Sequence, residues 1–462
     1  MERCVLLHRF AALVVVCVCL CLPVPRASAA VTQPLAKEFA ARVALAAYRQ
    51  PRAGLPQAQA SQPPKTDEYT LKPDRYAKAV AFSRDSYLMY FISVFLALAT
   101  IVLLLQFGVA AKYRDWAERV SDKRPVQALI FVPLLLLTVA AVQLPLRSYG
   151  HELSLRYELS VQRWGPWFLD WGKERLLILG FGILLALGIS FLVRRSPRRW
   201  WLCAWFAALP VAALLMLVAP WFIDPLFSHF EPLQETHPEL VTRIEKLTQH
   251  AGVPIPAGRM FLMRASEKTN EVNAYVSGVG ASKRVVIWDT TIQKATPDET
   301  LYIVGHELGH YVLGHIWKGF LFFAVSSFVG FYVLFRALHW ALGRWGGQWR
   351  IYGAEDWAAF AALLLLVETG TFLASPIANG FSRMQEHAAD VYGLEVAHGI
   401  IPDVLEVAAE SFQILGEADL ADPDPPPFIT LWLYSHPPIA ERLNFAYNYD
   451  PWDRGEAPKY VK

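Results

Sequence analysis

Residues 296–310 read TPDETLYIVGHELGH, and this stretch defines both a helix and the chemistry that the helix carries. It opens with a capping box, because a Thr is followed three residues later by a Glu and a Pro stands at the first helical position. The pattern predicts a helix that starts near Pro297 and runs through the end of the stretch. On that helix His306 and His310 lie one turn apart and project from the same face.

Two neutral imidazoles one turn apart can both hold a tetrahedral zinc ion. Glu307, next to the first His, can then lie beside the attacking water rather than on the metal. The alternative is an ordinary amphipathic helix with two hydrogen-bonded histidines, and the capped-helix context favours the zinc site over it. The motif therefore predicts a hydrolytic metal centre with Glu307 as its general base.

A catalytic zinc site needs a third protein ligand and one open position. His315 is one alternative, but it comes five residues after His310, about 140° round the helix. The stretch 382–390, SRMQEHAAD, is the better alternative, because Glu386 and Asp390 also lie one helical turn apart. One carboxylate can bind the metal while the other orients a ligand imidazole. A solvated helix face explains these charges nearly as well, so spacing alone leaves the choice open.

The composition indicates a membrane protein. Apolar residues make up 54% of the 462 residues and charged residues 18%, against roughly 45–50% and about 25% in soluble domains. The surplus lies in uncharged runs that approach or exceed the roughly 20 residues needed to cross a bilayer. Four of these runs precede the histidine motif and two follow it: about 87–111, 125–146, 176–193, 200–223, 319–335 and 357–375. The fifth run is short, and Glu368 interrupts the sixth.

Charge and cysteine usage exclude other kinds of site. The formal net charge is only +2, and the basic residues cluster in loops beside the apolar runs, so nucleic acid is not an expected partner. All five cysteines fall in apolar segments, which leaves none for a thiolate metal site: Cys4, Cys17, Cys19, Cys21 and Cys203. Any metal must therefore be held by His and carboxylate side chains.

The chain ends and loops predict an orientation. Residues 1–30 have a basic start, an apolar stretch and small residues, as in a signal peptide or an uncleaved signal anchor. Residues 31–86 then form an extracytoplasmic tether and N-terminal segment. The loops after the first, third and fifth apolar runs are rich in Arg and Lys, which marks them as cytoplasmic. Both observations place residues 224–316 and the C-terminal region outside the cytoplasm.

The polar region between the runs predicts a small α+β unit. Residues 236–239, THPE, are a second apparent capping box before a helix whose apolar positions share one face. Short β-like runs follow at 259–263, 273–276 and 284–288. The predicted fold is a mainly α-helical polytopic membrane protein with a small α+β zincin-like metalloprotease domain. Its expected parts are four transmembrane helices (87–223), a catalytic region with the histidine motif (224–316), two further transmembrane helices (317–375) and a C-terminal catalytic region (376–462).

The ordered set of motifs resembles the type I CAAX prenyl endopeptidase family, which are integral-membrane gluzincin zinc metalloproteases. The resemblance covers about residues 66–445. The predicted signal sequence and tether depart from the eukaryotic members, so we expect a bacterial-type member. The resemblance is carried by the residues 221–233, 273–275 with the following 284–290, 306–310, 382–390, and 435–438 with Arg442.

The resemblance implies roles for individual residues. One zinc ion would be held by His306, His310 and Glu386, and Glu307 would act as general base and acid. Asp390 would be the partner of a zinc-binding histidine. Asn273 would hold the substrate backbone. His436 and Arg442 would stabilise the oxyanion and the neighbouring structure. A water-filled chamber between the membrane helices is also implied, and Glu368 fits its lining.

The expected function is cleavage of a polypeptide substrate at the lipid bilayer. Because the topology places the zinc region outside, we expect an enzyme of the bacterial inner membrane that cuts membrane-associated or exported polypeptides. A transporter or channel is one alternative, and it predicts neither zinc nor hydrolysis. A catalytically silent scaffold is a second, and the intact set of catalytic residue types argues against it. An intramembrane site-2-type protease is a third alternative. That class places its zinc motif within a hydrophobic span, whereas the motif helix of this chain begins in a polar region.

Overall fold

The computed structural model describes residues 69–278 and 280–461. The predicted signal segment, and the tether up to residue 68, lie outside the described residues. Six of the described helices are long and apolar enough to cross a membrane, as the sequence predicts. They are α3 (Pro73–Gln106), α5 (Arg124–Arg156), α6 (Trp164–Arg195), α7 (Trp200–Phe222), α12 (His315–Trp349) and α13 (Ala359–Ala397).

The long helices extend beyond the apolar runs. Helix α3 starts at Pro73, inside the predicted N-terminal segment, because Pro suits the first helical turn and no Gly or Pro follows it before the apolar run. A short amphipathic helix, α4 (Val109–Val120), fills most of the basic loop after α3. Helix α13 is 39 residues long and continues through Pro376. The sixth apolar run and the stretch 382–390 therefore form one unbroken helix, where the sequence analysis places a domain boundary.

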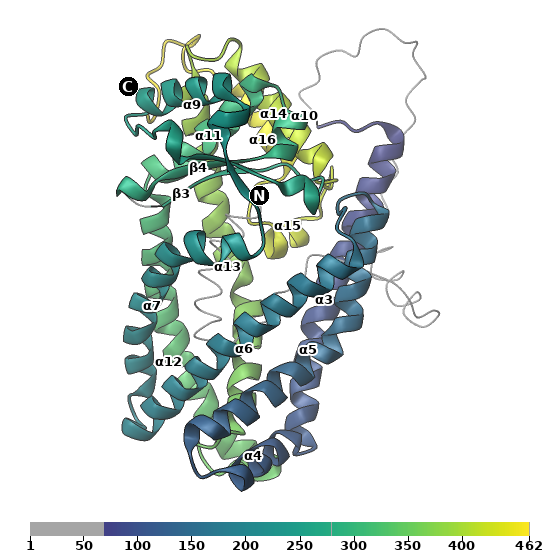
Figure 1. Cartoon of the computed structure of the whole chain (residues 1–462), viewed down its shortest axis with the longest axis vertical. Coiled ribbons are helices and arrows are strands. Elements are labelled where there is room, and N and C mark those ends of the chain that lie inside the picture. Colours follow the sequence, from purple (N-terminus) through teal and green to yellow (C-terminus); the bar gives the residue numbers. More distant parts are fainter. Residues whose placement is uncertain (1–68, 279, 462) are drawn as a thin grey trace.

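A small mixed sheet lies above the membrane helices (Figure 1). Its strand order is β1-β2-β4-β3, with β2 and β4 parallel and the outer pairs antiparallel. The strands are β1 (Phe230–Pro232), β2 (Met260–Met263), β3 (Ala274–Ser277) and β4 (Arg284–Trp288). The three predicted strands are confirmed to within about a residue. Strand β1 was not predicted, because a strand of three residues is too short to show an alternation of apolar and polar side chains.

Short helices surround this sheet, and together they form what we call the sheet lobe. They are α8 (Leu233–Thr236), α9 (Pro238–His250), α10 (Asp289–Lys294), α11 (Pro297–Val312), α14 (Val404–Ala418), α15 (Pro427–Leu433) and α16 (Ile439–Asn448), with the single 3₁₀ turns η1 (Asp224–Leu226), η2 (Ala257–Arg259), η3 (Ala265–Glu267) and η4 (Gly280–Ser282).

The two predicted capping boxes have different outcomes. The box at the start of α11 is confirmed, since the Thr296 hydroxyl accepts from the Glu299 amide and the Glu299 carboxylate accepts from the Thr296 amide. The box at Thr236 is wrong. Helix α9 does begin at Pro238, but Thr236 ends α8, and its hydroxyl donates to the Leu233 carbonyl at 3.4 Å.

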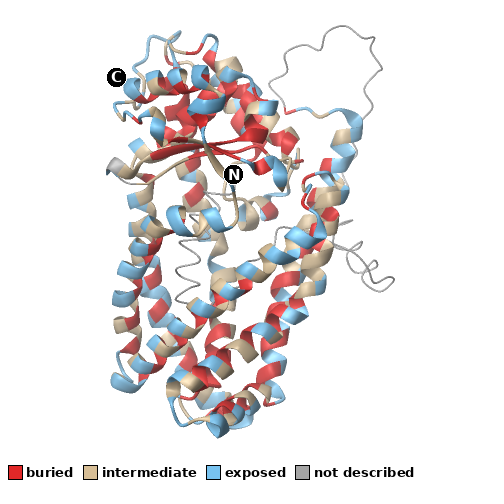
Figure 2. Ribbon diagram, viewed as in Figure 1, coloured by how far each residue is buried: buried red, intermediate tan, exposed pale blue. Residues whose placement is uncertain are grey.

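The molecule has two main apolar cores, one in the membrane bundle and one in the sheet lobe (Figure 2). Helix α13 contributes to both, with Phe360 and Leu364 in the bundle and Leu394 and Val396 in the lobe. Helix α13 therefore connects the lobe with the bundle. The predicted fold class, a mainly α-helical polytopic membrane protein with a small α+β domain, is confirmed.

Candidate metal centre

Helix α11 presents the histidine pair. His306 and His310 project from one face of the helix, and their Nε2 atoms lie 3.2 Å apart. Glu307 is the next residue, and its carboxylate lies 4.0 Å from the His306 Nε2 atom. The capped start of α11 fixes where this helix begins, so the three side chains keep a defined place relative to the sheet lobe.

Glycines let α13 approach α11 closely. A methyl group at residue 309 would lie 3.1 Å from the Tyr392 side chain, and one at residue 305 would lie 3.3 Å from Val396. A methyl group at residue 393 would lie 3.1 Å from the His306 amide nitrogen. Because these three positions are glycine, the two backbones pack at a distance that a longer side chain would not permit.

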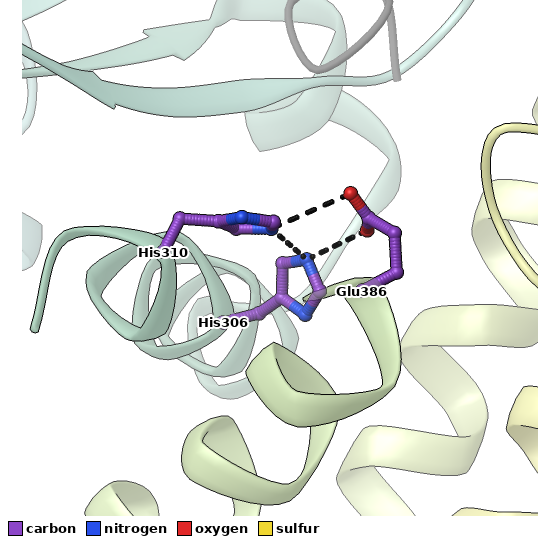
Figure 3. A group of neighbouring side chains, drawn as sticks. All are labelled: His306, His310 and Glu386. Atoms are coloured by element: carbon purple, nitrogen blue, oxygen red, sulfur yellow. Dashed lines mark hydrogen bonds and ion pairs between the residues drawn. The ribbon is translucent and has the colours of Figure 1, made fainter. Parts of the chain in front are cut away.

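This approach brings Glu386 to the histidine pair (Figure 3). Its Oε2 atom lies 3.4 Å from the His306 Nε2 atom, and its Oε1 atom lies 3.6 Å from the His310 Nε2 atom. One ligand atom from each of the three residues lies within 4.8 Å of the others. Of the two carboxylates that residue spacing left open, Glu386 is the one that faces both Nε2 atoms.

Asp390 contacts the other side of His306. Its Oδ1 atom lies 2.8 Å from the His306 Nδ1 atom, close enough for an ion pair. Arg442 of α16 holds the same carboxylate with two hydrogen bonds, of 2.6 and 3.0 Å. Burial alone would lower the pKa of Arg442, but Asp390 raises it above its usual value. Burial also opposes charge on His306, yet contacts with Asp390 and Glu386 raise its pKa to about 9.

His436 enters the site from the turn between α15 and α16. Its Nε2 atom lies 3.3 Å from the Glu386 Oε2 atom, and its Nδ1 atom lies 2.9 Å from the Ser435 hydroxyl. Burial lowers the pKa of His436 to about 3, so the ring is neutral at ordinary pH. Arg383 of α13 fixes this turn, because its guanidinium donates to the carbonyls of Thr430 and Tyr434. The sequence analysis missed Arg383, since spacing does not show what a guanidinium binds.

Asn273 lies immediately before the edge strand β3. Its backbone is held by the Thr291 hydroxyl, which accepts from the Asn273 amide at 2.8 Å and donates to its carbonyl at 2.7 Å. Its side-chain nitrogen is buried and forms no hydrogen bond among the described residues. The side chain is not part of the cavity wall described next.

A cavity of about 1120 Å³ runs from the site into the membrane bundle. Glu307, His310 and His436 line its upper end, and residues of α3, α7, α12 and α13 line much of the rest. The expectation that Glu368 lines this cavity is wrong. Its neighbours on α13, such as Val367 and Thr371, line the cavity, whereas Glu368 is not among the described residues that line it.

His315 is not a third ligand in this arrangement. It is the first residue of α12, and its Nδ1 atom lies 3.1 Å from the His310 Nδ1 atom, on the side of that ring opposite to Glu386. The sequence analysis considered His315 only as a ligand. It missed this contact because Gly314 ends the continuous helix and redirects the chain.

The residues fit a divalent metal ion. Both oxygens of Glu386 are buried and form no hydrogen bond among the described residues, while two imidazole Nε2 atoms face them. Two nitrogens and a carboxylate are the donor set of many catalytic zinc sites. A buried carboxylate without hydrogen bonds is costly unless a cation compensates it, so the arrangement suits an ion held between the three side chains.

Comparisons with known proteins identify the family. The family model for peptidase family M48 matches residues 234–449, and the one for the CAAX prenyl protease N-terminal region, with five membrane helices, matches residues 55–229. An uncharacterized metalloprotease of Bacillus subtilis, YhfN, is 36% identical over 81% of this chain and 86% of its own length. A CAAX prenyl protease 1 homolog of Arabidopsis thaliana is 24% identical over 82% of this chain and 89% of its own length.

The fold has a counterpart among solved structures. The crystal structure of S. mikatae Ste24p matches with a TM-score of 0.72 at 22% identity, over 82% of this chain and 90% of that one. The likeness extends over both the membrane helices and the sheet lobe, since it covers most of each chain. Neither the transporter nor the scaffold alternative is favoured by these findings. The chain belongs to peptidase family M48, and it is a membrane-embedded metalloendopeptidase of the CAAX prenyl protease type.

Proposed function

We propose that the enzyme uses one zinc ion, held by His306, His310 and Glu386, and that Glu307 is its general base. The observation that supports this assignment is the meeting of the three ligand atoms within 4.8 Å beside the cavity. Glu307 lines that cavity, so its carboxylate has access to water and to a bound peptide. The same arrangement leaves one side open for substrate, as a catalytic zinc site requires.

The side chains around the metal account for the proton transfers. A bound zinc ion polarises the scissile carbonyl and increases the acidity of the attacking water. Glu307 takes a proton from that water and returns it to the leaving amine. His436 is neutral and can donate from its Nε2 atom to the carbonyl oxygen as that oxygen gains charge. Asp390 keeps the His306 Nδ1 proton in place, which leaves the Nε2 atom of that ring for the metal.

The edge of the sheet is the proposed peptide-binding surface. Strand β3 is the last strand of the described sheet, and Tyr275, Val276 and Ser277 line the cavity. An extended peptide can pair with such an edge through its backbone. The side-chain nitrogen of Asn273 is buried and forms no hydrogen bond among the described residues, and we propose that this side chain holds the substrate backbone. Arg442 is bound to Asp390, so we propose that it supports the site and does not contact the peptide.

The proposed substrates are membrane-associated or exported polypeptides. Basic loops on the opposite side of the bundle support an extracytoplasmic sheet lobe, in a bacterial inner membrane. The relatives named CAAX prenyl proteases make a lipidated C-terminal peptide a second substrate class to test. A single cysteine placed at the exposed Glu239 tests the orientation. It should react with a membrane-impermeant thiol reagent on intact cells, whereas one placed at Arg198 should not, and the reverse pattern would overturn the orientation.

The activity test uses the full chain purified in detergent. We expect about one zinc per chain by metal analysis, and peptide cleavage that a chelator stops and added zinc restores. Glu307→Gln should retain zinc and lose cleavage, because it removes only the proton acceptor. Glu239→Gln, at an exposed position on α9, is the matched control and should cleave normally. Cleavage by a zinc-loaded Glu307→Gln protein would refute the assignment.

A further inference from the structure

His315, the first residue of α12, contacts the proposed metal ligand His310 from outside α11. Its ring meets that of His310 at 78°, with the two Nδ1 atoms 3.1 Å apart. The side chain is 5% exposed, so water does not compete freely for this contact. His306 has the matching contact on its own Nδ1 atom, from Asp390. The Nδ1 atom of each imidazole therefore contacts a side chain of a different membrane helix, α13 for His306 and α12 for His310.

The geometry determines which atom donates in the contact between His310 and His315. The His310 Nε2 atom faces Glu386, so a metal at the site binds that nitrogen through its lone pair. The neutral His310 ring must then carry its proton on Nδ1. A hydrogen bond of 3.1 Å between two Nδ1 atoms requires His315 to accept with its own Nδ1 lone pair, and so to carry its proton on Nε2.

The local backbone explains why His315 can reach this position. Gly314 has a positive φ of 67°, a conformation that favours glycine, and it separates α11 from α12. Without that turn, position 315 would lie well away from the face that holds His310. With it, the first residue of a membrane helix lies behind the metal ligand.

We propose that His315 is a positioning residue for His310: it accepts the Nδ1 proton of that ring and so sets the tautomer and orientation in which His310 binds the metal. The inference rests on the proposed zinc site. Its consequence is that the start of α12, a helix that also lines the cavity, is coupled directly to the metal centre. Partners of metal-binding histidines typically change metal affinity by about 10- to 100-fold when they are removed.

A pair of isosteric variants tests the role of the acceptor. In His315→Asn the amide oxygen can take the place of the Nδ1 atom, whereas His315→Leu has nearly the same shape and no acceptor. The zinc dissociation constant is measured by competition with a chelator, and the Co²⁺ absorption spectrum reports the ligand geometry. We expect His315→Leu to bind zinc about 10- to 100-fold more weakly and to change the Co²⁺ spectrum, with His315→Asn close to the unaltered protein.

Controls separate this inference from the proposed function. His339→Leu removes an exposed imidazole from the same helix and should leave zinc affinity unchanged. If His315→Leu does not fold, His315→Ala removes the acceptor without adding bulk and gives the same comparison with His315→Asn. Equal zinc affinity of the Leu, or the Ala, and Asn variants would overturn the role of His315 while leaving the zinc site intact. Failure of the unaltered protein to bind zinc would instead refute the proposed function on which the inference rests.

Discussion

Gly393 of α13 lies directly against the backbone of His306 on α11. A methyl group at residue 393 would lie 3.1 Å from the His306 amide nitrogen and 3.2 Å from its Cα atom. Backbone atoms inside a helix cannot move aside without moving the helix, so this contact sets the separation of the two helices. Glu386 and the histidine pair come from these different helices, and the fit of a metal between them depends on that separation.

Gly393→Ala should therefore weaken the metal site. The added methyl group has no space, and overpacking of this kind costs typically about 1–3 kcal/mol. We expect a lower melting temperature in detergent and weaker zinc binding, because the helix carrying Glu386 is displaced by a few tenths of an ångström. Gly343→Ala is the matched control, since Gly343 lies in α12 with nothing within 4 Å of the added group. An unchanged zinc affinity in Gly393→Ala would show that the helix separation is not critical.

Substitutions in the ion pair of Asp390 and Arg442 should change the free energy of unfolding and the zinc affinity in different ways. Asp390→Asn leaves a buried guanidinium without its counter-charge, and breaking a buried ion pair in this way costs about 3–5 kcal/mol. The double variant Asp390→Asn with Arg442→Met should recover much of that loss. Zinc affinity should remain low in both, because a neutral amide does not increase the basicity of His306. Thermal unfolding and chelator competition measure the two effects, and recovery of zinc affinity in the double variant would contradict this role of Asp390.

The confirmed capping box should be measurable as helix stability. Thr296→Ala removes the hydroxyl that accepts from the Glu299 amide and should cost about 1 kcal/mol. Thr236→Ala is the matched control, because Thr236 does not cap a helix and should change stability less. Thermal unfolding of the two variants in the same detergent makes the comparison. Equal losses would mean that the cap at α11 contributes nothing specific.

Zinc affinity should depend on pH through His306. The pKa of this ring is raised from 6.5 to about 9, so a proton occupies it at neutral pH unless a metal displaces that proton. Apparent zinc affinity should rise by about tenfold per pH unit up to roughly pH 9 and then level off. The stability of the zinc-free protein should change in the opposite direction. The protonated His306 ring stabilises the fold fully below pH 6.5, and this contribution to the free energy of unfolding is lost as the pH rises through about 9. Titration calorimetry across this range checks the slope, and a flat profile from pH 7 to 9 would contradict the raised pKa.

Local sequence patterns predicted much of the fold. Six apolar runs, three short strands and the capped helix of residues 296–310 are each encoded by residues close together in the chain, and the structure confirms them. The pattern at Thr236 misled because a capping box is recognised by residue types, whereas a cap also needs an extended backbone at its first residue. Glu368 misled because an intramembrane carboxylate indicates either a cavity or a partner, and its residue type does not show which of the two it has.

By itself the sequence determined the histidine pair, the adjacent glutamate and the membrane setting, because helix periodicity and bilayer length act over a few turns. Only the tertiary structure decided which carboxylate faces the two Nε2 atoms, where His315 lies and what Arg442 binds. These contacts join helices far apart in the chain, and they depend on how closely α11 and α13 pack at three glycines. Such close packing is a property of two surfaces together, and no single stretch of the sequence contains it.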